Sequence, residues 1–332
     1  MIRTLIATVL LSTLSLAAIA RPVVIAHRGA SGYLPEHTLP AVILAHGMSP
    51  DFIEQDLVLS KDGVLVVLHD IHLDTVTNVA EVFPARKRAD GRFYAIDFTL
   101  AELKQLTVHE RRDAQNQQVF ANRYQHNGSN SDLFKIATFE QQINLISELN
   151  RSRGTNIGLY PELKSPAFHR AAGQDISQIF MAMLEKYKLN QADANMFVQC
   201  FDFNETRRLR NELGLKTGLV QLLAENSWQE SDNDYAYLRS AQGLKEIAQV
   251  ADGIGPWLPQ LVDFETQAPT QLLMNAKAQG LKIHPYTLRA DQLPPNLNWQ
   301  QALTLTFDWL KVDGVFTDFP DKVSQYLQSK QK

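Results

Sequence analysis

Short apolar runs alternate with helical stretches along most of this 332-residue chain. Such an alternation favours a parallel β-sheet with helices between its strands, either open or closed into a barrel. The length fits one α/β barrel with an insertion, or two domains of about 150 residues each. We expect nine strands, at residues 23–26, 52–56, 64–68, 157–163, 196–201, 217–222, 253–255, 282–287 and 314–317. These candidates compete for the eight places of an α/β barrel.

Two intervals between the expected strands depart from the alternation. The second and third strands lie too close together for a crossover helix, and the turn pair Asp62-Gly63 stands between them. Residues 71–156, which separate the third strand from the fourth, are far too many for an ordinary connection. We therefore expect residues 71–156 to include an inserted subdomain and to end in a helix that re-enters the barrel. Thr138, with Gln141 three residues later, has the pattern of that helix's first turn.

The first twenty residues have the pattern of an export signal. Arg3 precedes a charge-free, mostly apolar run that ends in the small-x-small sequence Ala18-Ile19-Ala20. We expect residues 1–20 to be a cleaved signal peptide and residues 21–332 to form a mature barrel in the periplasm. An uncleaved membrane anchor is the alternative interpretation of the same run.

The composition argues against several classes of protein. Hydrophobic residues make up 45% of the chain and charged residues 20%, which is typical of a globular rather than a disordered protein. The net charge of −4 argues against a nucleic-acid partner, and no later apolar run is long enough to span a membrane. Cys200 is the only cysteine, so no intrachain disulfide can form, and its apolar neighbours indicate a packed residue rather than a nucleophile.

Ionisable residues gather where the first four expected strands end. They are His27, Arg28, Glu54, Asp56, His69, Asp70, Glu162 and Lys164. In a parallel barrel all of these ends share the face that carries active sites. Residues two apart on a strand point the same way, so Glu54 and Asp56 form one acidic pair. Glu162 and Lys164 are expected to project together from a strand two places on.

The carboxylates of Glu54, Asp56 and Glu162 are therefore expected to converge. Acidic groups brought together in a partly dry site either take up a proton or are neutralised by a cation, and we favour the cation. Oxygen ligands suit calcium or magnesium rather than zinc. A solvated strand face is the alternative for Glu54 and Asp56, although the apolar residues around them favour a buried strand.

His27 and His69 carry the one side chain that exchanges protons near neutral pH without a large pKa shift, so together they suit an acid and base pair. The alternative is a pair of hydrogen-bonded core histidines. Arg28 and Lys164 are donors suited to an anionic oxygen. A metal ion, two imidazoles and two cations describe a site for a phosphate diester.

Several short motifs occur in order along the chain. They are His27-Arg28-Gly29, Pro35-Glu36-His37-Thr38, Glu54-Gln55-Asp56, His69-Asp70, Pro161-Glu162-Leu163-Lys164, His284-Pro285-Tyr286-Thr287 and Asp313-Gly314-Val315-Phe316-Thr317-Asp318. The set resembles the motif series of the glycerophosphodiester phosphodiesterases over nearly the whole mature chain. That resemblance implies a distorted (β/α)8 TIM barrel similar to phosphatidylinositol-specific phospholipase C, with an insertion after the third strand.

The resemblance also implies an activity and roles for the site residues. Exported members of the family hydrolyse glycerophosphodiesters such as glycerophosphocholine and glycerophosphoethanolamine to glycerol 3-phosphate and an alcohol. Carried over to this chain, Glu54, Asp56 and Glu162 would bind one divalent cation, with calcium favoured over magnesium. His27 and His69 would be the acid and base, in an order that the sequence does not assign, and Arg28 and Lys164 would hold the phosphate. Many members have asparagine where His37 stands, which leaves the role of His37 open.

Two other functions remain as alternatives. One is a calcium-binding surface or adhesion protein that keeps the barrel without catalysis, and the presence of both histidines argues against it. The other is a phospholipase acting on intact lipids, which would need exposed membrane-binding elements. Phe201, Trp257 and Tyr286 fall near strand ends and either line the pocket or belong to the core.

Overall fold

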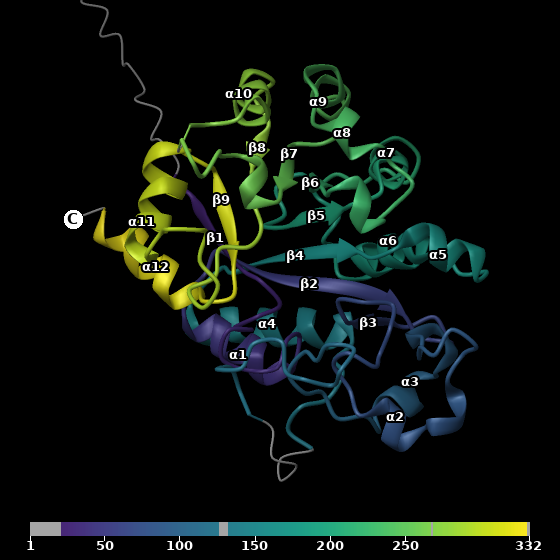
Figure 1. The fold of residues 1–332 in the computed structure, drawn as a ribbon. Coiled ribbons are helices and arrows are strands. Elements are labelled where there is room, and N and C mark those ends of the chain that lie inside the picture. The colour runs from purple at the N-terminus through teal and green to yellow at the C-terminus, as the bar shows by residue number, and fades with distance from the viewer. Residues whose placement is uncertain (1–20, 126–131, 267, 331–332) are drawn as a thin grey trace, which may run out of the picture.

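The computed structural model describes residues 21–125, 132–266 and 268–330, and the expected signal peptide lies outside these residues. Within them, eight parallel strands form a nearly closed barrel (Figure 1). They are β1 (Val23–Ala26), β2 (Phe52–Leu59), β4 (Gly158–Leu163), β5 (Phe197–Cys200), β6 (Gly218–Leu223), β7 (Gly253–Pro256), β8 (Lys282–Ile283) and β9 (Gly314–Thr317). Their hydrogen-bonded order is β8-β7-β6-β5-β4-β2-β1-β9. The end strands meet where the Leu288 amide donates to the Phe316 carbonyl at 2.9 Å.

Helices pack around the outside of the barrel. They are α1 (Leu39–Gly47), α2 (Val79–Val82), α3 (Leu100–Leu103), α4 (Phe139–Arg153), α5 (Pro166–Ala171), α6 (Ile176–Lys186), α7 (Phe203–Asn211), α8 (Tyr235–Leu238), α9 (Ala241–Ile247), α10 (Gln271–Ala278), α11 (Trp299–Leu303) and α12 (Pro320–Ser329). The expected start of α4 is confirmed, because Thr138 and Gln141 exchange the two hydrogen bonds of a capping box. Across the described parts of the chain, every helix is too short or too polar to cross a bilayer.

One of the nine expected strands stays outside the barrel. β3 (Leu65–Val67) pairs antiparallel with the far end of β2, with Leu57 opposite Val67. The turn between them contains Gly63 at φ 75°, a left-handed conformation that glycine adopts without a steric penalty. β2 is long enough to extend beyond the barrel, so the chain folds back as a hairpin instead of crossing over.

This hairpin corrects two expectations. His69 does not follow a parallel strand; it is carried back to the site because β3 runs toward the barrel, where the Leu68 amide donates to the Asp56 carbonyl at 2.9 Å. β4 is the immediate neighbour of β2 rather than two places away, and Asp56 is in register with Glu162. Asp56 and Glu162 therefore come from adjacent strands and lie closer together than the sequence suggested.

The segment between β3 and α4 covers the outside of the β2–β3 hairpin (Figure 1). It holds α2, α3 and two short 3₁₀ turns, and it has its own buried apolar cluster, separate from the main core. Val58 and Val66 of the hairpin belong to this cluster together with Phe98 and Phe134 of the segment. The segment is thus anchored on the hairpin that carries His69.

The part of the barrel interior that lies below the carboxyl ends of the strands, toward their amino ends, is filled by apolar side chains. Ile25, Phe52, Tyr160, Val220 and Phe316 form a buried cluster there. Gly158 makes room for it, since a Cβ atom at that position would lie 2.5 Å from the Phe52 ring. Inward-facing side chains recur every second residue. Two residues further along, toward the carboxyl ends, the same strands therefore present ionisable groups, as Glu54 follows Phe52 and Glu162 follows Tyr160.

Candidate active site

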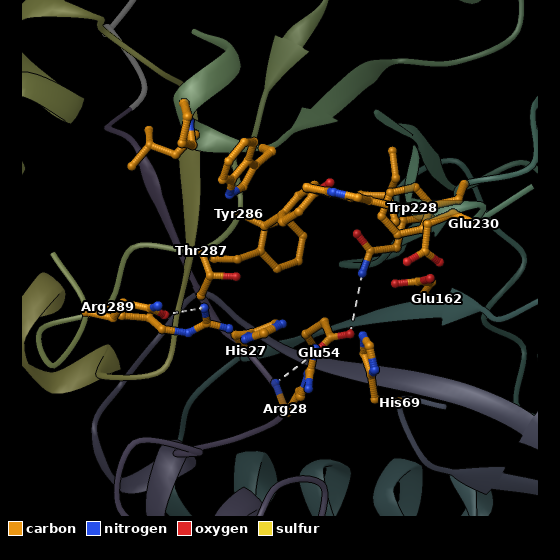
Figure 2. A pocket seen from close by; sticks show the side chains of 18 of the residues that line it. His27, Arg28, Glu54, His69, Glu162, Trp228, Glu230, Tyr286, Thr287 and Arg289 are labelled. Carbon is orange, nitrogen blue, oxygen red and sulfur yellow. Dashed lines mark hydrogen bonds between the residues drawn. The ribbon is translucent and has the colours of Figure 1, made fainter. Parts of the chain in front are cut away.

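A cavity of about 480 Å³ opens at the carboxyl ends of the barrel strands. Six of the seven predicted site residues line it, namely His27, Arg28, Glu54, Asp56, His69 and Glu162. The seventh, Lys164, is buried beside them, with its Nζ 2.8 Å from Glu162 Oε1. Figure 2 shows Glu54 between His27 and His69, so the two imidazoles flank the acidic residues as the sequence suggested.

Four buried side chains form the acidic centre. Glu54 and Asp56 come from β2 and Glu162 from β4, and each is at most 6% exposed. His37 joins them from the turn before α1, with Nε2 2.8 Å from Asp56 Oδ2. Ligand atoms of His37, Glu54 and Asp56 all lie within 4.8 Å of one another, whereas the third predicted ligand, Glu162, falls outside this group and is paired with Lys164. Among the described residues this is the one group of its kind with metal-binding geometry.

The three carboxylates of the acidic centre are shifted in different directions: burial opposes ionisation of Asp56, but His69 and His37 outweigh it and keep the pKa of Asp56 well below its usual value. Burial, reinforced by the adjacent Asp56 carboxylate, raises the pKa of Glu54 well above its usual value. Burial also raises the pKa of Glu162 to about 8, against the opposing effect of Lys164. A hard divalent cation would relieve this repulsion, and oxygen donors suit such a cation. The residues present therefore fit a metal site.

The first imidazole, His27, follows β1 and is held by Asp318, which follows β9. The His27 Nδ1 and Asp318 Oδ1 atoms are 2.6 Å apart, and Asp318 also accepts hydrogen bonds from Arg123 at 2.6 Å and Arg289 at 2.7 Å. Burial opposes ionisation of Asp318, but Arg289 and His27 outweigh it and keep its pKa well below the usual value. An ionised Asp318 accepts the Nδ1 proton, which leaves the His27 Nε2 free to exchange a proton.

The second imidazole, His69, is held in a similar way by its neighbour in sequence. Its Nδ1 lies 2.7 Å from Asp70 Oδ1, and Arg111 donates to Asp70 Oδ2 at 2.6 Å and to Glu36 Oε1 at 2.7 Å. Burial, followed by the positive charge of Arg28, lowers the pKa of His69 to about 3. The same two causes lower the pKa of His27 to about 4. Both imidazoles are therefore neutral at neutral pH.

The predicted phosphate ligands are engaged with carboxylates. The backbone amide of Arg28 donates to Glu54 Oε2 at 2.7 Å, and its guanidinium lies 3.1 Å from Glu36 Oε2. Arg289 is a third cation, which lines the cavity after β8 and which the sequence reasoning missed. It follows the His284–Thr287 motif by two residues, so its position beside a matched motif was the available signal.

Sequence reasoning also missed the partners of the histidines. Asp70 and Asp318 belong to the sequence motifs, but a motif does not show which side chains meet in the fold. Arg111 and Arg123 fall in the long segment that has no strand-end signal. Cys200 is buried, and burial raises the pKa of its thiol well above the usual value, as suits a packed residue. Phe201, Trp257 and Tyr286 all lie on the cavity wall.

Comparisons with known proteins agree with this geometry. The model of the glycerophosphoryl diester phosphodiesterase family matches residues 27–322. A glycerophosphodiester phosphodiesterase of Haemophilus influenzae is 39% identical over 92% of this chain and 90% of its own length. One from Treponema pallidum is 33% identical over 92% of this chain and 91% of its own length.

Solved structures share the fold. A putative glycerophosphoryl diester phosphodiesterase of Silicibacter pomeroyi superposes with a TM-score of 0.69 at 20% identity, covering 94% of this chain and 95% of its own. A phosphodiesterase of Oleispira antarctica, solved with the product sn-glycerol-3-phosphate, superposes with a TM-score of 0.59 at 23% identity, covering 93% and 97% of the two chains.

Proposed function

Because the chain belongs to the glycerophosphoryl diester phosphodiesterase family, we propose that it hydrolyses glycerophosphodiesters, such as glycerophosphocholine and glycerophosphoethanolamine, to sn-glycerol 3-phosphate and an alcohol. The observation that carries this proposal is the pair of carboxylate-held imidazoles, His27 and His69, on either side of a buried acidic centre. The sn-glycerol-3-phosphate found in the Oleispira antarctica phosphodiesterase is the product expected from such a substrate.

Glu54, Asp56 and Glu162 would hold one divalent cation, and calcium suits the oxygen donors better than magnesium because it tolerates irregular coordination. His37 either adds a ligand or holds Asp56 in place through its hydrogen bond. A cation bound there would offset negative charge on the phosphate. The raised pKa values of Glu54 and Glu162 support this assignment.

His27 and His69 would serve as the proton acceptor and donor of the reaction. One removes a proton from the attacking oxygen, which belongs either to a glycerol hydroxyl or to water, and the other protonates the departing alcohol. The Nδ1 atom of each ring is engaged by a carboxylate, so Nε2 is the atom that exchanges the proton. An anionic phosphate between the rings favours the protonated form of the ring that acts as the acid.

Arg28 and Lys164 would bind the phosphate, with Arg289, which lines the same cavity, as an additional donor. Each of them already neutralises a carboxylate, so phosphate binding would exchange one anion for another. Residues 1–20 would direct the chain to the periplasm, where deacylated phospholipids would supply the small-molecule substrate.

The test is release of glycerol 3-phosphate from glycerophosphocholine, coupled to glycerol 3-phosphate dehydrogenase and read as NADH formation. We expect turnover with calcium that stops on chelation and returns on adding the metal back. Absence of turnover with both calcium and magnesium, in protein that still binds calcium, would favour the non-catalytic calcium-binding alternative instead.

A further inference from the structure

The cavity has two chemically different halves. The ionisable floor comes from β1, β2 and β4, whereas the strand ends of β5 to β8 contribute Phe201, Trp228, Trp257 and Tyr286, which we call the aromatic wall. A cavity of about 480 Å³ is larger than glycerol phosphate needs. The aromatic wall therefore remains available to another part of the substrate, which is the departing alcohol.

The rings of the aromatic wall are fixed relative to one another. Trp228 and Trp257 pack edge to face with centroids 5.2 Å apart, and Phe201 and Tyr286 do so at 5.9 Å. The Tyr286 hydroxyl donates to the Leu223 carbonyl at 2.9 Å, so its polar end is engaged and its ring faces the cavity. Trp228 and Trp257 are 41% and 38% exposed, an unusual exposure for two adjacent indoles at a cavity mouth.

A carboxylate stands beside these rings. Figure 2 shows Glu230 next to Trp228 and above Glu162, on the opposite side of the cavity from Arg289. The Nζ atom of Lys164 lies 2.8 Å from Glu162 Oε1 but 4.0 Å from Glu230 Oε2, so Lys164 mainly neutralises Glu162 and leaves Glu230 less compensated. The Nζ of Lys164 also sits 5.3 Å from the centroid of Phe201, which places one cation against the aromatic wall already.

We propose that the aromatic wall and Glu230 bind the quaternary ammonium of a choline-type leaving alcohol, so that the site selects a cationic head group by charge as well as by shape. Aromatic faces attract a cation through their negative quadrupole, and the Glu230 carboxylate adds a Coulomb attraction. A quaternary ammonium has no N–H donors to satisfy, which suits a wall of rings. This inference rests on the proposed function, because it concerns the alcohol half of the same substrate.

The test compares two substrates of the same shape and different charge. Glycerophosphocholine is set against the 3,3-dimethylbutyl ester, in which carbon replaces the ammonium nitrogen. We expect kcat/KM to be about three- to thirty-fold higher for the choline ester. Equal values for the two esters would overturn the inference while leaving the proposed function intact.

Variants locate the selectivity within the cavity. Trp228→Leu and Glu230→Gln should each bring the ratio of the two kcat/KM values toward one. Trp309→Leu is the matched control, because Trp309 is 58% exposed in a separate groove and should leave the ratio unchanged. An unaltered ratio in both cavity variants would contradict the assignment of these residues.

A binding measurement separates this inference from catalysis. Choline should change the tryptophan fluorescence of the full chain at concentrations at least threefold lower than 3,3-dimethylbutanol, and Trp228→Leu should remove that difference. If neither ester is cleaved but choline still binds selectively, the proposed function fails and the head-group site stands. If both esters are cleaved and choline shows no preference over the neutral alcohol, the head-group site fails.

Discussion

The two imidazoles of the site are held in similar ways by different parts of the molecule. His27 and Asp318 follow the neighbouring barrel strands β1 and β9, and their side chains are 11% and 2% exposed. His69 and Asp70 lie on the hairpin outside the barrel, and their side chains are 27% and 26% exposed. Barrel strands therefore carry both members of the His27–Asp318 pair, whereas the His69–Asp70 pair depends on the hairpin and on the segment packed against it.

The arginines that hold the two carboxylates do not follow this division between barrel and hairpin. Arg123 and Arg111, one for each imidazole–carboxylate pair, both come from the segment between β3 and α4. Arg123 reaches across to Asp318, so that the segment supports the barrel pair as well. We therefore expect the segment to contribute to catalysis through positioning, although it supplies neither imidazole.

The largest effect should follow removal of either imidazole. His27→Ala and His69→Ala should each lower kcat by about 10²- to 10⁴-fold, since each removes one proton transfer. The coupled assay measures this, with circular dichroism to verify the fold. His72→Ala is the control, because His72 packs on Tyr94 at a ring distance of 4.5 Å and lies outside the cavity lining. A near-normal rate in one of the two variants would remove that histidine from the mechanism.

Replacing the carboxylate partner of each imidazole should lower the free energy of unfolding by different amounts in the two imidazole–carboxylate pairs. Asp318→Asn leaves Arg289 without an ionised partner and removes the buried carboxylate that holds His27, while Arg123 keeps Asp291, and we expect the free energy of unfolding to fall by about 2 kcal/mol. Asp70→Asn should cost about 1 kcal/mol or less, because Asp70 is partly exposed and Arg111 keeps Glu36. Urea unfolding measures both values, and equal losses would erase the distinction drawn between the pairs.

Glu110, a buried residue of the segment between β3 and α4, should make the free energy of unfolding depend on pH. Burial, followed by the nearby Glu36 charge, raises the pKa of Glu110 to about 8. The folded pKa lies above the unfolded value, so this contribution is complete below about pH 4.5 and is lost as the pH rises through 8. Glu110→Gln should therefore gain up to roughly 3 kcal/mol relative to wild type between pH 5.5 and pH 8.5. Glu148→Gln on the exposed face of α4 is the control, and parallel pH profiles for wild type and Glu110→Gln would refute the expectation.

Much of the barrel and its acidic centre could be predicted because both follow from short-range patterns. Alternating strands and helices indicated the barrel, and the two-residue step along β2 placed Glu54 and Asp56 on one side. The prediction that His69 reaches the site was right, but the prediction that it follows a parallel barrel strand was wrong. An apolar run of strand length does not reveal whether the strand pairs parallel or antiparallel. The short interval with Asp62-Gly63 contained the hairpin signal that excluded a crossover.

The partners of the imidazoles could not be predicted for a different reason. Asp318 meets His27 only because β9 closes against β1, a contact between residues at opposite ends of the chain. Arg111 and Arg123 reach the site from a segment whose path depends on packing against Val58 and Val66, and packing of that kind leaves no periodic signal. The metal, the roles of the two histidines and the export of the chain stay predictions.

Calorimetric titration of the metal-free protein with calcium tests most directly whether the buried carboxylates of β2 and β4 share one cation. We expect one calcium ion to bind the wild-type chain, with affinity at least tenfold weaker in Glu162→Gln and weaker still in Glu54→Gln, while Glu148→Gln binds as wild type does. Calcium binding of unchanged affinity in Glu54→Gln and Glu162→Gln would contradict the account.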